Sequence, residues 1–413
     1  MTDWLLLTLA FLVPATYACA HSIDRGQIRI DHVTLFSLGF IFYWVTPMVA
    51  GFLIDANDMP TTFAMFFDTH WTRPYLVAII AIYFAFIAGD RFGGWAFSHR
   101  RIRKQVWTQG RNRALPLQIL ALFSGAAFLV FVVEILVHRV ELFAPYTTDM
   151  GGQISRGNVT AWVVLLGSLV FLRISSHPRF TVLILPFAVG ALFLMLIGSR
   201  LYVASFVLMF AAFRSLYIVP FSKKQVALAG LLMVALFGTV GALRVNSSIM
   251  DAGFNVLLEP LLTSVSLVYF LRYDHLAWLA APRYLISDFC NLLPSAIFPG
   301  KAALIRAPDV FSPLGALHSF VSFNFNFGLI GTAVFMFLLP ASLRWIKARD
   351  KSPLYRTMYV MLSGWLAFTF FRDGFSISIV KDMVQHSILL PTAIVAFVKL
   401  IEIATRNVLA PDA

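Results

Sequence analysis

Residues 180–220 read FTVLILPFAVGALFLMLIGSRLYVASFVLMFAAFRSLYIVP. As a single helix, these roughly 40 residues would be about 60 Å long at 1.5 Å per residue, twice the thickness of the apolar core of a bilayer. The chain must therefore fold back once within this stretch. The only polar break near its middle is Gly198-Ser199-Arg200, where glycine and serine favour a tight reversal. We predict two membrane-spanning helices here, with Arg200 at the membrane surface between them.

The amino-acid composition excludes a soluble globular protein. Hydrophobic residues make up 59% of the 413 residues, charged residues make up 13%, and the mean hydropathy is +0.81. Apolar runs of about 20 residues, long enough to cross a bilayer, recur from one end of the chain to the other. We predict an all-α, polytopic membrane protein whose spans, about 11 in number, lie near residues 4–20, 33–54, 75–92, 115–137, 159–174, 180–198, 201–219, 226–243, 323–343, 357–371 and 378–398.

The whole chain, 1–413, is expected to form a single transmembrane domain. Its N-terminal segment MTDW lacks the basic region of a cleavable signal peptide, so we expect the first span to remain. The longest stretch between spans, 246–319, is too long for a structureless loop, and its apolar and charged residues alternate at helical spacing. We therefore predict a helical cap inserted between transmembrane helices. If part of the cap dips into the membrane, the number of passes rises to about 12 or 13.

Two basic stretches set the orientation in the membrane. SHRRIRKQVWTQGRNR (98–113) and RWIKARDKSPLYR (344–356) are dense in Lys and Arg, which places both in the cytoplasm. The N-terminus and the cap are then outside, and the C-terminus is cytoplasmic. Most of the net charge of +12 follows from this topology, and because the basic residues form no single face we expect no nucleic-acid partner. The two cysteines, Cys19 and Cys290, are far apart and indicate neither a disulfide framework nor a metal site.

Several basic residues remain on the outer side in this topology. Arg200, Arg244 and Arg372 each stand at the end of a span and would lie at a similar depth. Lys381 is deeper, about 9 Å along the last span, in the stretch FFRDGFSISIVKD (370–382). A charge at this depth usually faces a protein interior or a watery cavity. Lys381 either pairs with Asp382 or Asp373 nearby, or lines a polar site.

The cap ends in a polar and aromatic motif, LHSFVSFNFNFGLIG (317–331). A lone histidine at the end of a span, such as His318, is more often structural than catalytic. Its ordinary pKa of about 6.5 nevertheless makes it a candidate general base near neutral pH.

Four motifs together resemble a known family. GSR (198–200), LPSAIFPGK (293–301), HSFVSFNFNFGLIG (318–331) and FFRDGFSISIVKD (370–382) follow one another as in the Wzy-type O-antigen polymerases, over residues 185–398. The resemblance implies a membrane glycosyltransferase of GT-C-like fold in the bacterial inner membrane, with its active site facing the periplasm. Such enzymes join undecaprenyl-pyrophosphate-linked oligosaccharide repeat units into surface polysaccharide and release undecaprenyl pyrophosphate. No cofactor is implied, and the chain has no P-loop and no D-x-D motif. Membrane lipids and a chain-length regulator protein are further expected partners.

The resemblance also suggests roles for individual residues. We expect the arginines to stabilise the departing pyrophosphate, because guanidinium binds phosphate through paired hydrogen bonds. The residues expected to do so are Arg200, Arg244 and Arg372, followed by Lys381 and Arg283. His318 is the candidate base and, with Arg200 and Arg372, the candidate catalytic set; Asp288, Asp274 and Glu259 are alternative bases. Trp278, Tyr273 and Tyr284 are candidates for stacking on sugars.

Two alternatives remain open on these residues. An O-antigen ligase would use the same donor with lipid A core as the acceptor, although ligases have a histidine-asparagine pair where this chain has His318-Ser319. A flippase for lipid-linked sugars would also need arginines for pyrophosphate. It should, however, show internal repeats and charge that reaches the cytoplasmic side, and neither is evident from the sequence.

Overall fold

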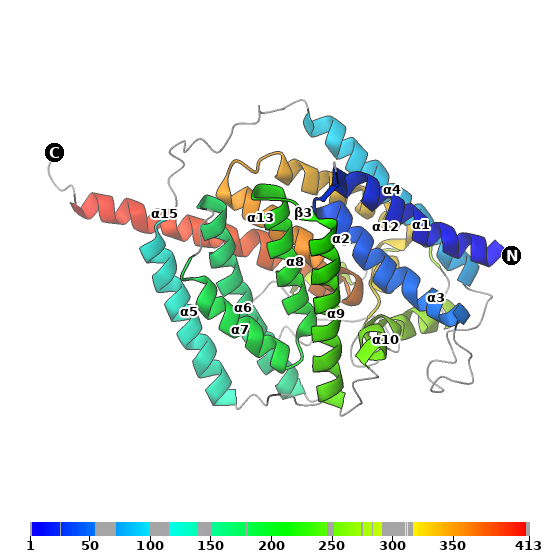
Figure 1. Cartoon of the computed structure of the whole chain (residues 1–413), viewed down its shortest axis with the longest axis horizontal. Coiled ribbons are helices and arrows are strands. Elements are labelled where there is room, and N and C mark those ends of the chain that lie inside the picture. Colours follow the sequence, from blue (N-terminus) through cyan, green and yellow to red (C-terminus); the bar gives the residue numbers. More distant parts are fainter. Residues whose placement is uncertain are drawn as a thin grey trace.

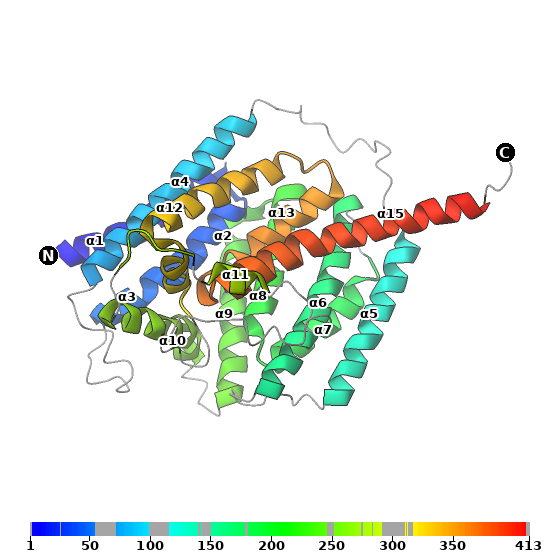
Figure 2. The same ribbon diagram turned by 180° about the vertical axis from the view of Figure 1, so that it is seen from behind.

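The computed structural model describes residues 2–24, 26–53, 72–98, 115–138, 142, 150–177, 181–245, 252–273, 276–282, 284–290, 310, 312 and 317–409. This part of the chain is almost entirely helical (Figures 1 and 2). The helices are α1 (Thr2–Ser22), α2 (His32–Gly39), η1 (Phe40–Val45), α3 (Thr46–Leu53), α4 (Thr72–Ser98), α5 (Leu117–His138), α6 (Met150–Ser176), α7 (Ile184–Leu196), α8 (Arg200–Tyr217), α9 (Lys223–Val245), α10 (Ala252–Tyr273), α11 (Leu285–Phe289), α12 (Ser319–Lys347), α13 (Pro353–Trp365), α14 (Thr369–Arg372), η8 (Ser376–Leu389) and α15 (Leu390–Leu409).

The expectation of an all-α, polytopic membrane protein is confirmed. Within the described residues, 8 helical segments are long and apolar enough to cross a membrane. They coincide with eight of the predicted spans. The other three predicted spans are also helical, as α7, α9 and α13, but α7 and α13 have only 13 residues each, or about 20 Å. The count of about 11 spans therefore stays a prediction.

The predicted reversal at Gly198 is present. α7 ends at Leu196, Gly198 has a φ of 90°, and α8 begins at Arg200. A positive φ of this size is free of strain only for glycine. The Ser199 amide closes the turn by donating to the carbonyl of Leu194 at 2.9 Å. α7 and α8 therefore pack against each other as a helical hairpin, with Arg200 at its tip.

One end of the helix bundle gathers the segments that flank the basic loops, and we call it the basic end (residues 22–31, 90–95, 215–222 and 344–356). A small antiparallel sheet lies here, which the all-α expectation did not include. Its strands are β1 (Ile23–Asp24), β2 (Gln27–Ile28) and β3 (Phe221–Ser222), in the order β1-β2-β3. Asp31 then caps α2 by accepting hydrogen bonds from the Val33 and Thr34 amides. The end of the bundle where α7 turns into α8 is the opposite end.

α4 and α12 lie side by side along most of their length, in both views (Figures 1 and 2). Glycines allow this approach: a Cβ at Gly89 would collide with the backbone of Phe337, and one at Gly93 would lie 2.9 Å from the Cα of Ala341. Small residues at such contacts are typical of helix packing in membranes. At the basic end, Arg344 of α12 donates two hydrogen bonds to Asp90 of α4, at 2.6 and 2.8 Å. Close packing and a buried ion pair thus join the two helices.

Aromatic side chains fill the bundle between its two ends. Phe36 of α2 stacks on Phe86 of α4 with ring centroids 3.9 Å apart, and it also contacts Phe370 and Phe371. All four rings are fully buried. These phenylalanines pack α2, α4 and α14 against one another in the interior of the bundle.

The two described helices of the predicted cap, α10 and α11, lie near the opposite end. α10 packs against α9, η1, α3 and α12, whereas α11 packs against η8. The boundaries of the cap, 246–319, fall in or next to parts of the chain outside the described residues, so they stay a prediction.

Replacing Gly89 by alanine should destabilise the protein, because the added methyl group collides with the backbone of α12. We expect a cost of about 1–3 kcal/mol, typical of overpacking, seen as a lower midpoint of thermal unfolding in detergent. Gly94→Ala is the matched control, since a Cβ at Gly94 meets nothing within 4 Å. Equal stability of the two variants would contradict the described packing.

Candidate functional site

Arg372 is the centre of a charged cluster at the opposite end. Its Nε donates to Oε2 of Glu259 on α10 at 3.1 Å, and its Nη1 donates to Oδ1 of Asp373 at 2.8 Å. The side chain remains 19% exposed. Because two carboxylates from different segments hold the guanidinium, its position is fixed while part of it still faces outward.

The sequence around Arg372 explains why it stands there. α14 has only 4 residues and ends at Arg372, after which Asp373 is extended and Gly374 follows. The Phe375 amide then donates to the Ser322 hydroxyl at 2.8 Å, which ties the start of η8 to the first turn of α12. The motifs 318–331 and 370–382, far apart in sequence, therefore meet at this point.

A second group of polar side chains continues from this cluster into the bundle. The Tyr202 hydroxyl of α8 donates to Oδ1 of Asp382 at 3.4 Å, and Nδ1 of His386 lies 3.2 Å from the same oxygen. Tyr202 also lies within the electrostatic reach of Arg372 and Asp373. The motif at 198–200 therefore leads into the same site, two residues before Tyr202.

Asp288 of α11 is a further carboxylate of this region. It accepts a hydrogen bond from Nδ2 of Asn326 on α12 at 3.3 Å and another from Ser376 of η8. The residue is only 5% exposed, and burial raises the pKa of its carboxyl to about 6. Burial likewise raises the pKa of Asp373 to about 6, with Asp382 and Glu259 adding to the shift and Arg372 opposing it. Both carboxyls therefore titrate close to neutral pH.

α12 is interrupted at Gly328, which has a φ of 67°, and the segment before α11 docks on this break. The amides of Leu329 and Ile330, freed from the helix, donate to the carbonyls of Ala277 and Trp278 at 2.8 and 3.1 Å. A broken helix within a membrane protein needs such replacement partners. A Cβ at Gly328 would lie 2.7 Å from Leu279, so only glycine permits this docking. The break thus anchors the segment 276–280, which precedes α11.

His318 lies apart from the surface, in a closed aromatic pocket. Its ring is fully buried, stacks on Trp44 with centroids 5.8 Å apart, and meets the edge of Tyr75. Burial lowers the pKa of His318 to about 3, although a backbone interaction with Tyr43 opposes this. In this conformation the imidazole is neutral and shielded. Its role as general base stays a prediction, and it would require the pocket to open.

Fewer contacts define the positions of the other candidate residues. Arg200 is half-buried at the tip of the α7–α8 hairpin, and Lys381 is half-buried on η8. No ion pair to Lys381 occurs among the described residues, so its expected pairing with Asp382 or Asp373 is not seen there. Trp278 is 72% exposed, and Tyr284 meets the ring edge of Phe325. Arg283 and Asp274 and the side chains of Arg244 and Tyr273 lie outside the described residues.

The sequence alone missed the ion pair between Arg372 and Glu259. These residues are far apart in sequence, and Glu259 stood out only as an alternative base. Tyr202 was also missed, although its position two residues after Arg200 in an apolar helix was a usable signal.

Comparisons of the chain with protein-family models, curated proteins and solved structures gave no match. Within the described residues, no group of three or more His, Cys, Asp or Glu side chains is arranged to hold a metal ion. The chemistry open to the site is therefore inferred from its own residues, namely Arg372 and the three carboxylates Asp288, Asp373 and Glu259.

Asp373→Asn should change the pH dependence of stability. Because the pKa of Asp373 is raised from 3.8 to about 6 in the folded protein, the wild type loses stability as the pH rises from about 4 to 6. Asparagine cannot ionise, so the difference in unfolding midpoint between the two proteins should shift in favour of the variant over this interval and stay constant above it. The variant also loses the hydrogen bond to the Asp373 carboxylate, which changes its unfolding midpoint by an amount that does not depend on pH. Thermal unfolding in detergent from pH 4 to 8 measures the difference; a difference that does not vary with pH would contradict the raised pKa.

Proposed function

We propose that this chain is a glycosyltransferase of the bacterial inner membrane that polymerises oligosaccharide repeat units carried on undecaprenyl pyrophosphate. In this proposal it has about 11 spans, the basic end lies in the cytoplasm and the opposite end faces the periplasm. Its similarity to the Wzy-type polymerases is part of the proposal. The main support is Arg372, a partly exposed guanidinium fixed by Glu259 and Asp373 at the end of the bundle that carries Arg200.

The cluster around Arg372 suits a pyrophosphate leaving group. When the bond between the anomeric carbon and the phosphate oxygen breaks, negative charge develops on the departing pyrophosphate. A cation that is already in place stabilises this charge without having to reorganise. Arg372 is held in this way by two hydrogen bonds, and Arg200 begins the neighbouring helix α8. We assign pyrophosphate binding to these two arginines.

The acceptor must lose a proton as it attacks. A hydroxyl at the non-reducing end of one lipid-linked repeat forms the new bond to the anomeric carbon of the growing chain, and undecaprenyl pyrophosphate leaves with the bonding electrons. We assign the role of general base, which accepts this proton, to the Asp288 carboxylate. Its pKa of about 6 leaves it ionised at neutral pH, yet basic enough to take up a proton. Asn326 and Ser376 hold that carboxylate in position. The exposed ring of Trp278, on the segment docked at Gly328, is available to stack on a sugar.

A transporter is less well supported than an enzyme whose active site faces one side of the membrane. A flippase for the same lipids would need a polar route between the two sides of the membrane. Here the buried rings of Phe36, Phe86, Phe370 and Phe371 pack together between the two ends, where a polar route along α2, α4 and α14 would have to pass. An O-antigen ligase uses the same donor and differs only in its acceptor. No described residue distinguishes a lipid A core acceptor from another repeat unit.

Arg372→Ala should reduce the rate of polymerisation by roughly 10²–10³-fold while the protein stays folded in the membrane, because a preorganised donor to the developing charge is lost. Arg372→Lys should also be impaired, by roughly tenfold or more, since a point charge cannot reproduce the paired hydrogen bonds. The assay is the ladder of glycolipids formed from undecaprenyl-pyrophosphate-linked repeats by the purified protein.

Arg272→Lys is the matched control, since Arg272 is an exposed arginine near the same end, on α10. It should retain nearly full activity. Full activity of both Arg372→Ala and Arg200→Ala would refute the proposal.

The pH profile of kcat/KM should rise through about pH 6, because Asp288 must lose its proton before it can act as a base. Asp288→Asn should abolish this rise and lower kcat/KM by roughly 10²-fold or more. His318→Phe, which keeps an aromatic ring beside Trp44, should keep the rise. If the rise instead disappears in His318→Phe or in Asp373→Asn and survives in Asp288→Asn, the base has been assigned to the wrong residue.

A further inference from the structure

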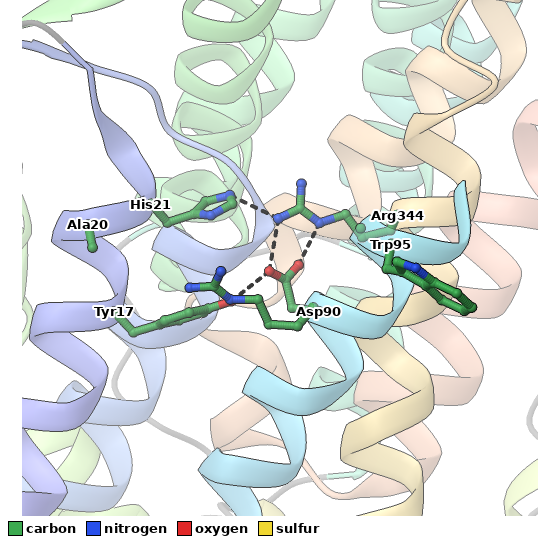
Figure 3. A pocket seen from close by; sticks show the side chains of 8 residues that line it. Tyr17, Ala20, His21, Asp90, Trp95 and Arg344 are labelled. Carbon is green, nitrogen blue, oxygen red and sulfur yellow. Dashed lines mark hydrogen bonds and ion pairs between the residues drawn. The ribbon is translucent and has the colours of Figure 1, made fainter. Parts of the chain in front are cut away.

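A second polar site lies at the basic end, far from Arg372. There, α1, α4 and α12 enclose a pocket of about 490 Å³ lined by Tyr17, His21, Asp90, Arg91, Trp95 and Arg344 (Figure 3). Asp90 is buried in its floor and accepts hydrogen bonds from Arg344 and from the Tyr17 hydroxyl, the latter at 2.7 Å. The proposed glycosyl transfer makes no use of this pocket.

The pocket carries an excess of positive charge. Two arginines, Arg91 and Arg344, line it with a single carboxylate, Asp90. Beside the pocket, Lys347 pairs with Asp31. Further, His21 lies 2.9 Å from Asp31 and 3.1 Å from Nη2 of Arg344.

The donors of Arg344 are not all used in this network. Its Nε and Nη2 are engaged by Asp90 and His21 (Figure 3), whereas Nη1 makes no hydrogen bond to any described residue. Arg91 lies over the Tyr17 ring at 5.6 Å and is otherwise exposed. Two guanidinium groups are thus available to one anion.

The surroundings of the pocket are those of a membrane surface. Trp95 is 67% exposed and Phe92 is 46% exposed on α4, as in the aromatic belts of membrane proteins. The exposed apolar side chains of Val77 and Phe84, about four and two turns before Arg91, lie on the same face of α4 as that arginine. A basic pocket beside an exposed apolar helix face matches an anionic amphiphile and offers more than a free anion requires.

We propose that this pocket binds the phosphodiester headgroup of an anionic phospholipid, with an acyl chain lying along the face of α4 that carries Val77 and Phe84. Arg91 and Nη1 of Arg344 donate to the phosphate oxygens, and Trp95 lies at the level of the headgroup. Basic pockets between helices are known to select phospholipid headgroups in this way. The bound lipid would link α1 to α4 and α12 at the basic end. This proposal does not depend on the glycosyltransferase proposal.

The test is lipid binding to the purified full-length protein, measured by native mass spectrometry in detergent with phosphatidylglycerol and phosphatidylcholine as probes. Phosphatidylglycerol should bind more tightly, and Arg91→Gln should weaken its binding about fivefold, the amount expected for one basic residue at a membrane surface. Arg349→Gln is the control, because Arg349 stacks on Trp345 outside the pocket. Equal binding of both lipids, or equal loss in both variants, would overturn the proposal.

Two further measurements distinguish the binding of a lipid from the binding of a free anion. Phe84→Ser, which removes an exposed apolar side chain from the face of α4 that would hold the acyl chain, should weaken phosphatidylglycerol binding several-fold and leave any weak binding of glycerol phosphate unchanged. If inorganic phosphate or glycerol phosphate binds as tightly as phosphatidylglycerol, and Phe84→Ser has no effect, the site is a free anion site and the lipid assignment is overturned.

Discussion

The close contact between α4 and α12 organises this structure. Two helices can approach this closely in a membrane only where side chains are absent, and Gly89 and Gly93 provide that space against Phe337 and Ala341. The ion pair between Asp90 and Arg344 then fixes the register of the two helices at the basic end. Removing Arg344 would leave the buried Asp90 with only Tyr17 and His32 as partners among the described residues, and the loss of one partner of a buried ion pair is costly. Towards its other end, α12 has the kink at Gly328, where the segment 276–280 docks through the Leu329 and Ile330 amides.

The two charged clusters lie at opposite ends of the bundle, with the buried phenylalanines Phe36 and Phe371 between them. At the opposite end, Arg372 is held by carboxylates from α10 and from its own loop, and Asp288 and Asp373 titrate near neutral pH because they are buried. At the basic end, the charges are linked in a network that opens to the membrane surface. The first arrangement suits a reaction in which an anionic group departs. The second suits an anionic group that stays.

The sequence predicted those features that depend on length and local conformation. The reversal at Gly198 followed from about 40 apolar residues with one polar break, and the spans followed from hydropathy. Features that depend on contacts between distant segments were not predictable: nothing in the sequence pairs Glu259 with Arg372, or Asp90 with Arg344. The small sheet β1-β2-β3 joins two segments about 200 residues apart and is too short for a strand pattern. His318 stood out by its residue type, but only the packing of Trp44 and Tyr75 around it shows that it is shielded.

We propose that the site at Arg372 transfers a glycan from a lipid pyrophosphate, without moving the lipid across the membrane. The most direct measurement uses the purified protein in detergent micelles, where no second side exists, with labelled undecaprenyl-pyrophosphate-linked repeats and no nucleotide or metal. We expect one undecaprenyl pyrophosphate to be released for each glycosidic bond formed. Unchanged glycolipids in micelles, together with movement of the same lipids across the bilayer of vesicles that contain the protein, would contradict this account.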